Sequence, residues 1–296
     1  MMKGRLGLES SRVPQADRHG LLWLLHGRLN AEDGTLRFVT TGGGDLSRGD
    51  YAIPFQMLSA ILLGPGTSVT HDALRLVARH GCALVAVGDD GVRFYASMPS
   101  SSDDSALARR HARAWADEPQ RLRLARRLYA WRLGEVLPDS DIAVLRGIEG
   151  ARMKETYKLL AQKFGVRWEG RRYDRHRPEA TDLPNQAINH VVTAVESAAM
   201  LAVTLTGAIP SLGFIHEDSG NAFTLDITDL YRDLVTLPCA FQAVRDYERE
   251  IDTPGVSIER IARRGAGQLL REKKIVPAMI DRIKELFGAN DGGGHT

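Results

Sequence analysis

The chain has 296 residues, of which 43% are hydrophobic and 26% charged, and its formal net charge is +2. The length allows one large domain or two ordinary ones, of which we expect two, and the composition is typical of a soluble globular protein and argues against a largely disordered chain. Two cysteines in apolar settings exclude a disulfide framework, and the most apolar stretch, 198–209, is too short and too interrupted for a membrane span, so we expect a cytoplasmic protein without membrane contact.

Residues 1–97 are predicted to form a small β-rich domain. Short apolar runs separated by turn residues predict strands at 21–25, 36–40, 58–63, 82–87 and 92–96. Gly88–Gly91 is a turn signal, and Thr70 is a suitable cap for a helix over 72–79. Gly42–Gly44 lacks the Lys and Ser/Thr of a phosphate-binding loop and is interpreted as a hairpin tip.

A larger all-α domain is predicted at 105–288. The polar segment 98–104 has no apolar periodicity and is the expected linker, and 289–296 is the expected disordered tail. Helical periodicity covers 105–116, 119–133, 142–164, 185–206, 224–247 with a break at Pro238, and one or two further helices in 256–287. The predicted fold class is therefore α+β, with a β-sandwich-like N-terminal domain and a helical C-terminal domain.

Basic charge is concentrated in the middle of the chain. Residues 146–177 hold ten Lys or Arg against four acids, and residues 104–136 hold eight Arg against four acids. Such segments could neutralise the phosphates of a nucleic acid, but solvated helix faces give the same pattern.

Three aspartates, Asp226, Asp229 and Asp233, stand at i, i+3 and i+7 and share one face of a predicted helix. Their mutual repulsion suggests a cation or a basic partner, although a solvated acidic face is an alternative. His216 lies in the loop before this helix and would add an imidazole to a mainly carboxylate site that suits Mg²⁺ or Mn²⁺. A solvated loop histidine is the alternative there.

Glu149 lies between two glycines, Gly147 and Gly150, within a helical pattern. Each glycine costs about 1 kcal/mol relative to alanine in a helix, a cost that close packing or the approach of a ligand would explain. An acid in the first turn of a helix is the alternative interpretation.

In this order and spacing, the segments 146–152, 213–216 and 225–229 resemble the Glu, His and Asp metal motifs of the CRISPR adaptation integrase family. Three further segments, 64–71 with Arg75, 87–97 and 170–174, resemble its subtype I-E form. The resemblance extends from about Ala16 to Leu286.

The resemblance implies that Glu149, His216 and Asp229 ligate Mg²⁺ or Mn²⁺, with Asp226 assisting catalysis. It also implies DNA contacts by basic residues, which we expect at Arg75, Arg93, Arg146, Arg152, Arg171, Arg172 and Arg232. Two departures are present: Glu217-Asp218-Ser219 follows His216 where relatives carry a Lys, and His26 and Trp23 stand where relatives carry an end-stacking Tyr.

The implied activity is that of a metal-dependent DNA endonuclease and integrase, which inserts spacer DNA into a CRISPR array by 3′-hydroxyl attack on a phosphodiester. A stand-alone nuclease for branched DNA repair intermediates, or a DNA-binding scaffold without chemistry, would carry the same basic segments. The family further implies double-stranded and branched DNA as partners, a homodimer, and a 4:2 complex with a small ferredoxin-like partner, Cas two.

Overall fold

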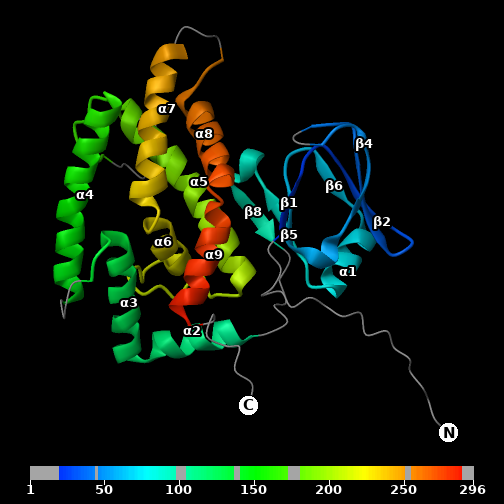
Figure 1. The fold of residues 1–296 in the computed structure, drawn as a ribbon, viewed down its shortest axis with the longest axis horizontal. Coiled ribbons are helices and arrows are strands. Elements are labelled where there is room, and N and C mark those ends of the chain that lie inside the picture. Colours follow the sequence, from blue (N-terminus) through cyan, green and yellow to red (C-terminus); the bar gives the residue numbers. More distant parts are fainter. Residues whose placement is uncertain are drawn as a thin grey trace. The chain divides into compact units, whose positions relative to one another are not determined.

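The computed structural model describes residues 20–43, 46–97, 105–136, 141–172, 181–250 and 255–288. The chain divides into two compact units, the first comprising Met1–Val87 and Tyr95–Asp104, the second Gly88–Phe94 and Ser105–Thr296. Strands lie in the first unit and long helices in the second (Figure 1), so the α+β class is confirmed. The expected linker 98–104, the expected tail 289–296 and Gly44 lie outside the described residues.

The strands form two four-stranded sheets. One has the order β1 (Gly20–Leu24), β5 (Leu58–Leu63), β7 (Ala83–Val87) and β8 (Phe94–Ser97), and the other has the order β4 (Gly49–Ile53), β3 (Thr35–Thr40), β2 (Gly27–Glu32) and β6 (Thr67–Val69). β1, β5 and β7 pair in parallel, whereas β3 pairs antiparallel with both β2 and β4. β5 is an almost unbroken apolar run, as expected for a parallel strand that is buried on both faces.

The apolar runs correctly predicted the strands of the first sheet and β3 of the second but missed β2, β4 and β6. β2 and β4 alternate between less and more exposed residues, and polar residues such as Arg28 and Asp50 interrupt the runs on which the prediction relied. The last strand starts at Phe94 instead of Val92, because Gly88–Arg93 forms a turn with a 3₁₀ segment at Asp89–Gly91, closed by a 2.7 Å hydrogen bond from Gly88 N to Arg93 O.

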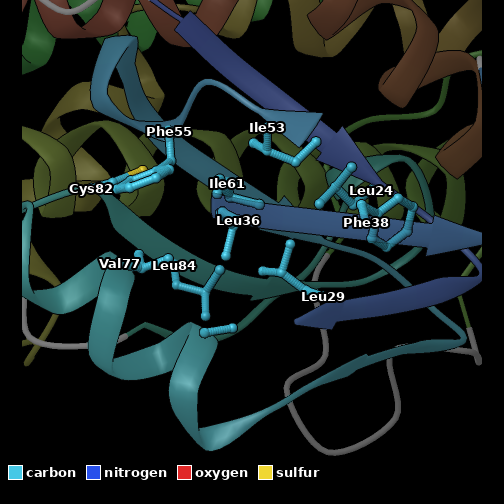
Figure 2. Packing of buried hydrophobic residues seen from close by; sticks show 11 residues of the cluster. Leu24, Leu29, Leu36, Phe38, Ile53, Phe55, Ile61, Val77, Cys82 and Leu84 are labelled. Carbon is cyan, nitrogen blue, oxygen red and sulfur yellow. The ribbon is translucent and has the colours of Figure 1, made fainter. Parts of the chain in front are cut away.

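Both sheets contribute to one hydrophobic core (Figure 2). Leu24, Ile61 and Leu84 come from the first sheet, and Leu29 and Phe38 come from the second. Helix α1 (His71–Arg79) packs on the same core and starts as predicted, with the Thr70 hydroxyl accepting a hydrogen bond from Ala73 N at 3.3 Å. The first unit therefore encloses its own core between its two sheets and α1.

The second unit is helical and is built around α5. Its helices are α2 (Ala106–Ala116), α3 (Glu118–Leu133), α4 (Ile142–Phe164), α5 (Leu183–Thr206), α6 (Ala222–Asp229), α7 (Leu237–Glu250), α8 (Ile258–Glu272) and α9 (Ile275–Leu286). α5 packs against α6, α7, α8 and α9. It is long and apolar enough to cross a membrane, yet more than half of its most apolar window is buried inside the unit, which is typical of a core helix.

The predicted helix 224–247 is interrupted earlier than expected. α6 ends at Asp229, and Arg232–Thr236 forms a π-helical turn before α7 begins at Leu237. Pro238 is the second residue of α7, where a helix does not need its missing N–H, so the predicted break at Pro238 is wrong. Asp233 is consequently separated from Asp226 and Asp229 by a change in helix geometry.

The turn Gly88–Phe94 belongs to the helical unit, not to the β-rich residues around it. The Ser197 hydroxyl of α5 donates to Val92 O and accepts from Phe94 N, each at 3.2 Å. Arg93, which was expected in the β-rich domain, lies in this turn and faces Glu259 of α8 at 3.9 Å.

Candidate metal centre

Asp226 is a buried carboxylate that holds the loop before α6. Its Oδ2 accepts hydrogen bonds from the backbone N–H groups of Phe214 at 2.6 Å and Ile215 at 3.2 Å. Its Oδ1 accepts from His216 N at 3.0 Å and from His216 Nδ1 at 2.8 Å. The side chain of Asp226 is fully buried and both of its oxygens accept hydrogen bonds from the loop. Asp226 therefore positions this loop and the His216 ring.

The hydrogen bond from Asp226 orients the imidazole of His216. A carboxylate can only accept, so Nδ1 carries the proton and the lone pair of Nε2 is free to ligate. His216 Nε2 lies 3.8 Å from Asp229 Oδ2, on the last residue of α6. The bond to Asp226 raises the pKa of His216, burial opposes this, and Asp229 adds to it, so a proton competes with a cation for the ring.

Two side chains of helix α2 form hydrogen bonds with the backbone of the segment that precedes α6. His111 Nδ1 accepts from Ile209 N at 3.2 Å, which leaves Nε2 to donate to Leu212 O at 2.7 Å. Trp115 Nε1 donates to Gly213 O at 3.0 Å. The ring of His111 is buried against Phe214, with the ring centroids 5.4 Å apart. The sequence offered only weak signals for His111 and Trp115, which we did not select as functional.

Burial lowers the pKa of His111 from its usual 6.5 to about 4, against the opposing effects of the Leu212 carbonyl and Asp226. The unfolded chain takes up a proton on His111 near pH 6.5, whereas the folded chain does so only near pH 4. The contribution of neutral His111 to the free energy of unfolding is therefore fully present above pH 6.5 and is lost as the pH falls towards 4. The free energy of unfolding is expected to fall by about 3 kcal/mol across this interval. Urea unfolding of the wild type and His111→Gln at several pH values measures it; a difference between the two that does not change with pH would contradict the expectation.

Gly213 is required by close packing. A Cβ at this position would lie 2.1 Å from His216 O and 2.7 Å from the Cβ of Ala222. Gly213→Ala is therefore expected to lower the free energy of unfolding by about 3 kcal/mol, as for other overpacked cores. Gly147→Ala is the matched control, because a Cβ there meets no described atom within 4 Å; thermal unfolding should show it equal to or more stable than the wild type.

Glu149 lies on the buried stripe of α4, in the third turn of the helix. The stripe repeats every four residues through Leu145, Met153, Tyr157 and Ala161, and Glu149 is the acid within it. The alternative of an acid in the first helical turn is therefore wrong, since α4 begins at Ile142. Close packing of Gly147 and Gly150 is also not observed, because added Cβ atoms there would meet no described atom within 4 Å.

Arg132, near the end of α3, connects Glu149 to Asp229. Its Nη1 donates to Asp229 Oδ2 at 2.7 Å, and its Nη2 forms an ion pair with Glu149 Oε1. The side chains of Arg132, Glu149 and Asp229 are 6%, 17% and 12% exposed. Asp229 Oδ1 also accepts from Arg232 Nη2 at 2.5 Å. In the sequence, Arg132 is only one of the eight Arg of residues 104–136, so this role was not predicted.

Two polar groups at this centre are imperfectly bonded. Among the described residues, Arg132 Nε and Nη2 have no aligned hydrogen-bond acceptor, and Asp233 Oδ1 has no donor. Burial raises the pKa of Asp233, against the opposing charges of Arg132 and Arg232. Asp233 belongs to the π-helical turn, a geometry that is frequent at functional sites.

The donor set suits a hard divalent cation. The two Nη atoms of the Arg132 guanidinium contact Glu149 and Asp229, one each. Because these two nitrogens belong to one planar group, the two carboxylates lie close together. His216 Nε2 approaches the same oxygen of Asp229. In the part of the chain that the structure describes, no three His, Cys, Asp or Glu side chains are already arranged to hold a metal ion, and Arg132 contacts both Glu149 and Asp229. Asp229 is thus linked to Glu149 through Arg132 and lies 3.8 Å from His216 Nε2.

A basic cavity of about 630 Å³ adjoins the centre, next to Gly150 of α4. Its lining includes Lys154, Lys158, Arg171 and Arg232. The rings of Tyr157 and Trp168 line it as well and stack with centroids 4.8 Å apart.

The other expected DNA contacts are dispersed. Arg146 is exposed one turn before Glu149, Arg152 pairs with Glu135, and Arg172 pairs with Glu169. Arg75 is exposed in the first unit and pairs with Asp72 at 3.0 Å. Arg171 is held by Asn185 and Asn189 at 2.9 and 2.7 Å. Only Arg171 and Arg232 of the expected set line the cavity.

The two departures from the family pattern are also located. Glu217, which follows His216, faces Arg121 at 3.7 Å. His26 is exposed with a positive φ of 52°, whereas Trp23 is partly buried in β1. His26 is therefore the more accessible of the two candidate stacking groups.

The family model described as "CRISPR associated protein Cas1" matches residues 23–136 and 129–253 of the chain. The chain belongs to the Cas1 family. The CRISPR-associated endonuclease Cas1 3 of Methanospirillum hungatei is 33% identical over 278 residues, which cover 94% of this chain and 89% of the relative. The Cas1 endonuclease of Escherichia coli is 32% identical over 280 residues, which cover 94% and 88%.

Solved Cas1 structures share the fold. A crystal structure of a TtCas1–DNA complex is 32% identical, covers 92% of this chain and 97% of the solved one, and superposes with a TM-score of 0.81. A casposase bound to an integration product has a TM-score of 0.62 at 16% identity, a likeness of fold alone.

Proposed function

We propose that the chain is a metal-dependent DNA endonuclease and integrase that inserts spacer DNA into a CRISPR array, in the subtype I-E form. The observation that supports the proposal most is the position of Asp229 on α6, which shares the Arg132 guanidinium with Glu149 of α4 and lies 3.8 Å from His216 Nε2. A basic cavity lined by Arg232 adjoins it. The curated relatives are named CRISPR-associated endonucleases, and a solved Cas1 is described in complex with DNA.

Glu149, His216 and Asp229 would hold Mg²⁺ or Mn²⁺. When bound, this cation supplies Lewis-acid stabilisation of the negative charge on phosphodiester oxygens. Asp226 orients His216 so that Nε2 faces the centre. In the reaction, the 3′-hydroxyl of an incoming DNA end would attack a phosphodiester at the border of a repeat. A new phosphodiester forms, the P–O3′ bond of the target strand breaks, and the 3′-hydroxyl of that strand leaves with the proton of the attacking group.

The basic cavity would bind the DNA backbone next to the reacting phosphate. Lys154, Lys158 and Arg171 supply positive charge for phosphates, and Trp168 offers an aromatic face for an unpaired base. Arg232 lines the cavity and pairs with Asp229, so it connects the DNA path to the centre.

A strand-transfer assay tests the proposal against a stand-alone nuclease for branched DNA. A labelled short duplex is incubated with Mn²⁺ or Mg²⁺ and a supercoiled plasmid carrying a repeat array. The label is expected to join the plasmid covalently at both repeat borders, and a duplex with 3′-dideoxy ends is expected not to join. Cleavage of branched DNA without any joining, with the partner protein present, would overturn integration in favour of repair.

The assembly is part of the same proposal. A homodimer formed through the β-rich units and a 4:2 complex with the ferredoxin-like partner Cas two, acting in the cytoplasm, agree with the family pattern of the motifs. Val39 on β3 and Met57 before β5 expose 45% and 60% of their surface, which suits burial in such an interface. Light scattering of the chain, alone and with the partner, measures the stoichiometry directly.

A further inference from the structure

We propose that Arg132 competes with the divalent cation for the two carboxylates of the candidate centre, so that its guanidinium withdraws when the cation binds. Arg132 would then be a positioning residue that holds Glu149 and Asp229 together and sets the affinity for the metal. The inference rests on the proposed function, because it takes Glu149, His216 and Asp229 as the metal ligands.

The contacts of Arg132 coincide with those that a cation would make. Its Nη1 lies 2.7 Å from Asp229 Oδ2, which is also the oxygen nearest to His216 Nε2 at 3.8 Å. Its Nη2 is in contact with Glu149 Oε1. Mg²⁺ and Mn²⁺ bind carboxylate oxygens at about 2 Å. A cation bound to both Asp229 Oδ2 and Glu149 Oε1 would therefore need the position that the guanidinium of Arg132 now fills.

The local charges point to the same competition. Glu149 and Asp229 carry two negative charges, and Arg132 and Arg232, which pair with them, carry two positive charges. Burial opposes the charge on Arg132, yet Asp229 and Glu149 hold its pKa above the usual value, so it stays a cation. A divalent ion bound to the same two carboxylates would lie next to the Arg132 guanidinium, and the repulsion between these like charges favours withdrawal of the guanidinium.

Arg132 also has an acceptor to which it can turn. Its Nε and Nη2 lack aligned acceptors, and Asp233 Oδ1 lacks a donor within the described residues. Asp233 follows Asp229 in the chain and lies in the π-helical turn Arg232–Thr236 that comes after α6. In the proposed exchange, the guanidinium that leaves Asp229 binds Asp233 Oδ1 instead.

The experiment measures Mn²⁺ binding without DNA, by isothermal titration calorimetry on the full chain. Arg132→Gln is expected to bind Mn²⁺ about tenfold more tightly than the wild type, equivalent to about 1.4 kcal/mol. Its melting temperature in EDTA should fall, because Glu149 and Asp229 then repel each other, and Mn²⁺ should raise it by more than in the wild type. Arg127→Gln, on the same helix but paired with surface Glu285, is the matched control and should bind as the wild type does.

Equal or weaker Mn²⁺ binding by Arg132→Gln would overturn the competition, since a purely structural role predicts weaker binding. If this variant does not fold, Arg132→Lys takes its place, because lysine keeps the positive charge but cannot contact both carboxylates as the guanidinium does. The proposal then requires Arg132→Lys to bind Mn²⁺ more tightly than the wild type. Glu149→Gln separates the two proposals. If it binds Mn²⁺ as well as the wild type does, the metal site of the proposed function fails, whatever Arg132 does.

Discussion

Glu149→Ala is expected to lower the rate of strand transfer by at least about 10³-fold, a loss of about 4 kcal/mol of transition-state stabilisation. DNA affinity should not weaken, because it depends on basic side chains such as Lys154 and Arg171. The protein should remain folded, since Arg132 keeps its hydrogen bond to Asp229 when Glu149 is removed. Single-turnover strand transfer and a DNA-binding titration measure the two effects separately.

Glu155→Ala is the control for this variant, because Glu155 is an exposed acid on the same helix and pairs with Lys158 at 2.8 Å. It should behave as the wild type in both assays. If Glu149→Ala retained strand transfer and nuclease activity, the chain would be a DNA-binding scaffold without chemistry at this centre.

Asp226→Ala is expected to lower the free energy of unfolding by about 3–5 kcal/mol, the usual cost of removing one partner from a buried charged network. It leaves the N–H groups of Phe214, Ile215 and His216 without their acceptor. For a unit of this size the melting temperature should fall by about 10 °C. The affinity for Mn²⁺ should fall by about 10- to 100-fold, because His216 is no longer oriented.

Asp218→Ala, an exposed aspartate of the same loop, controls for the loss of one negative charge and should leave both quantities unchanged. Asp226→Asn keeps the size of the side chain but removes its charge. Its amide has one acceptor oxygen, and its NH₂ group would face the backbone N–H donors of the loop. This variant should therefore also be less stable than the wild type. An Asp226→Asn protein as stable as the wild type would contradict the network described here.

The helices of the second unit could be predicted within a few residues because their apolar periodicity is strong and their caps are explicit. α4 is bounded by Asp141, whose side chain accepts from Ala143 N, and by Gly165 in a left-handed conformation. The π-helical turn after Asp229 could not be predicted, because Pro238 offered a more obvious break and no single residue encodes the turn. β2 and β4 were missed because polar residues such as Arg28 and Asp50 interrupt their apolar pattern, although both strands pair with β3, their neighbour in the chain.

The three predicted ligands came from a family resemblance, and the residue patterns alone left alternatives open for each. A clearer signal was present for Glu149, an acid on an otherwise apolar i, i+4 stripe. The same reasoning would have found Arg132, which continues the buried stripe of Ala125, Leu128 and Tyr129 on α3. Its role required the structure, since its partners lie on α4 and α6.

The turn Gly88–Phe94 means that the polypeptide passes from one unit to the other and back before it finally enters the helical unit at Ser105. Expression of 105–296 alone would omit the strand-to-strand turn that binds Ser197, and Ser197 would then lose both Val92 and Phe94 as partners on the core helix α5. The helical unit is therefore incomplete without this turn, which interrupts the β-rich unit in the sequence. A truncated protein made to isolate the helical unit should therefore retain Gly88–Phe94 together with Ser105–Thr296.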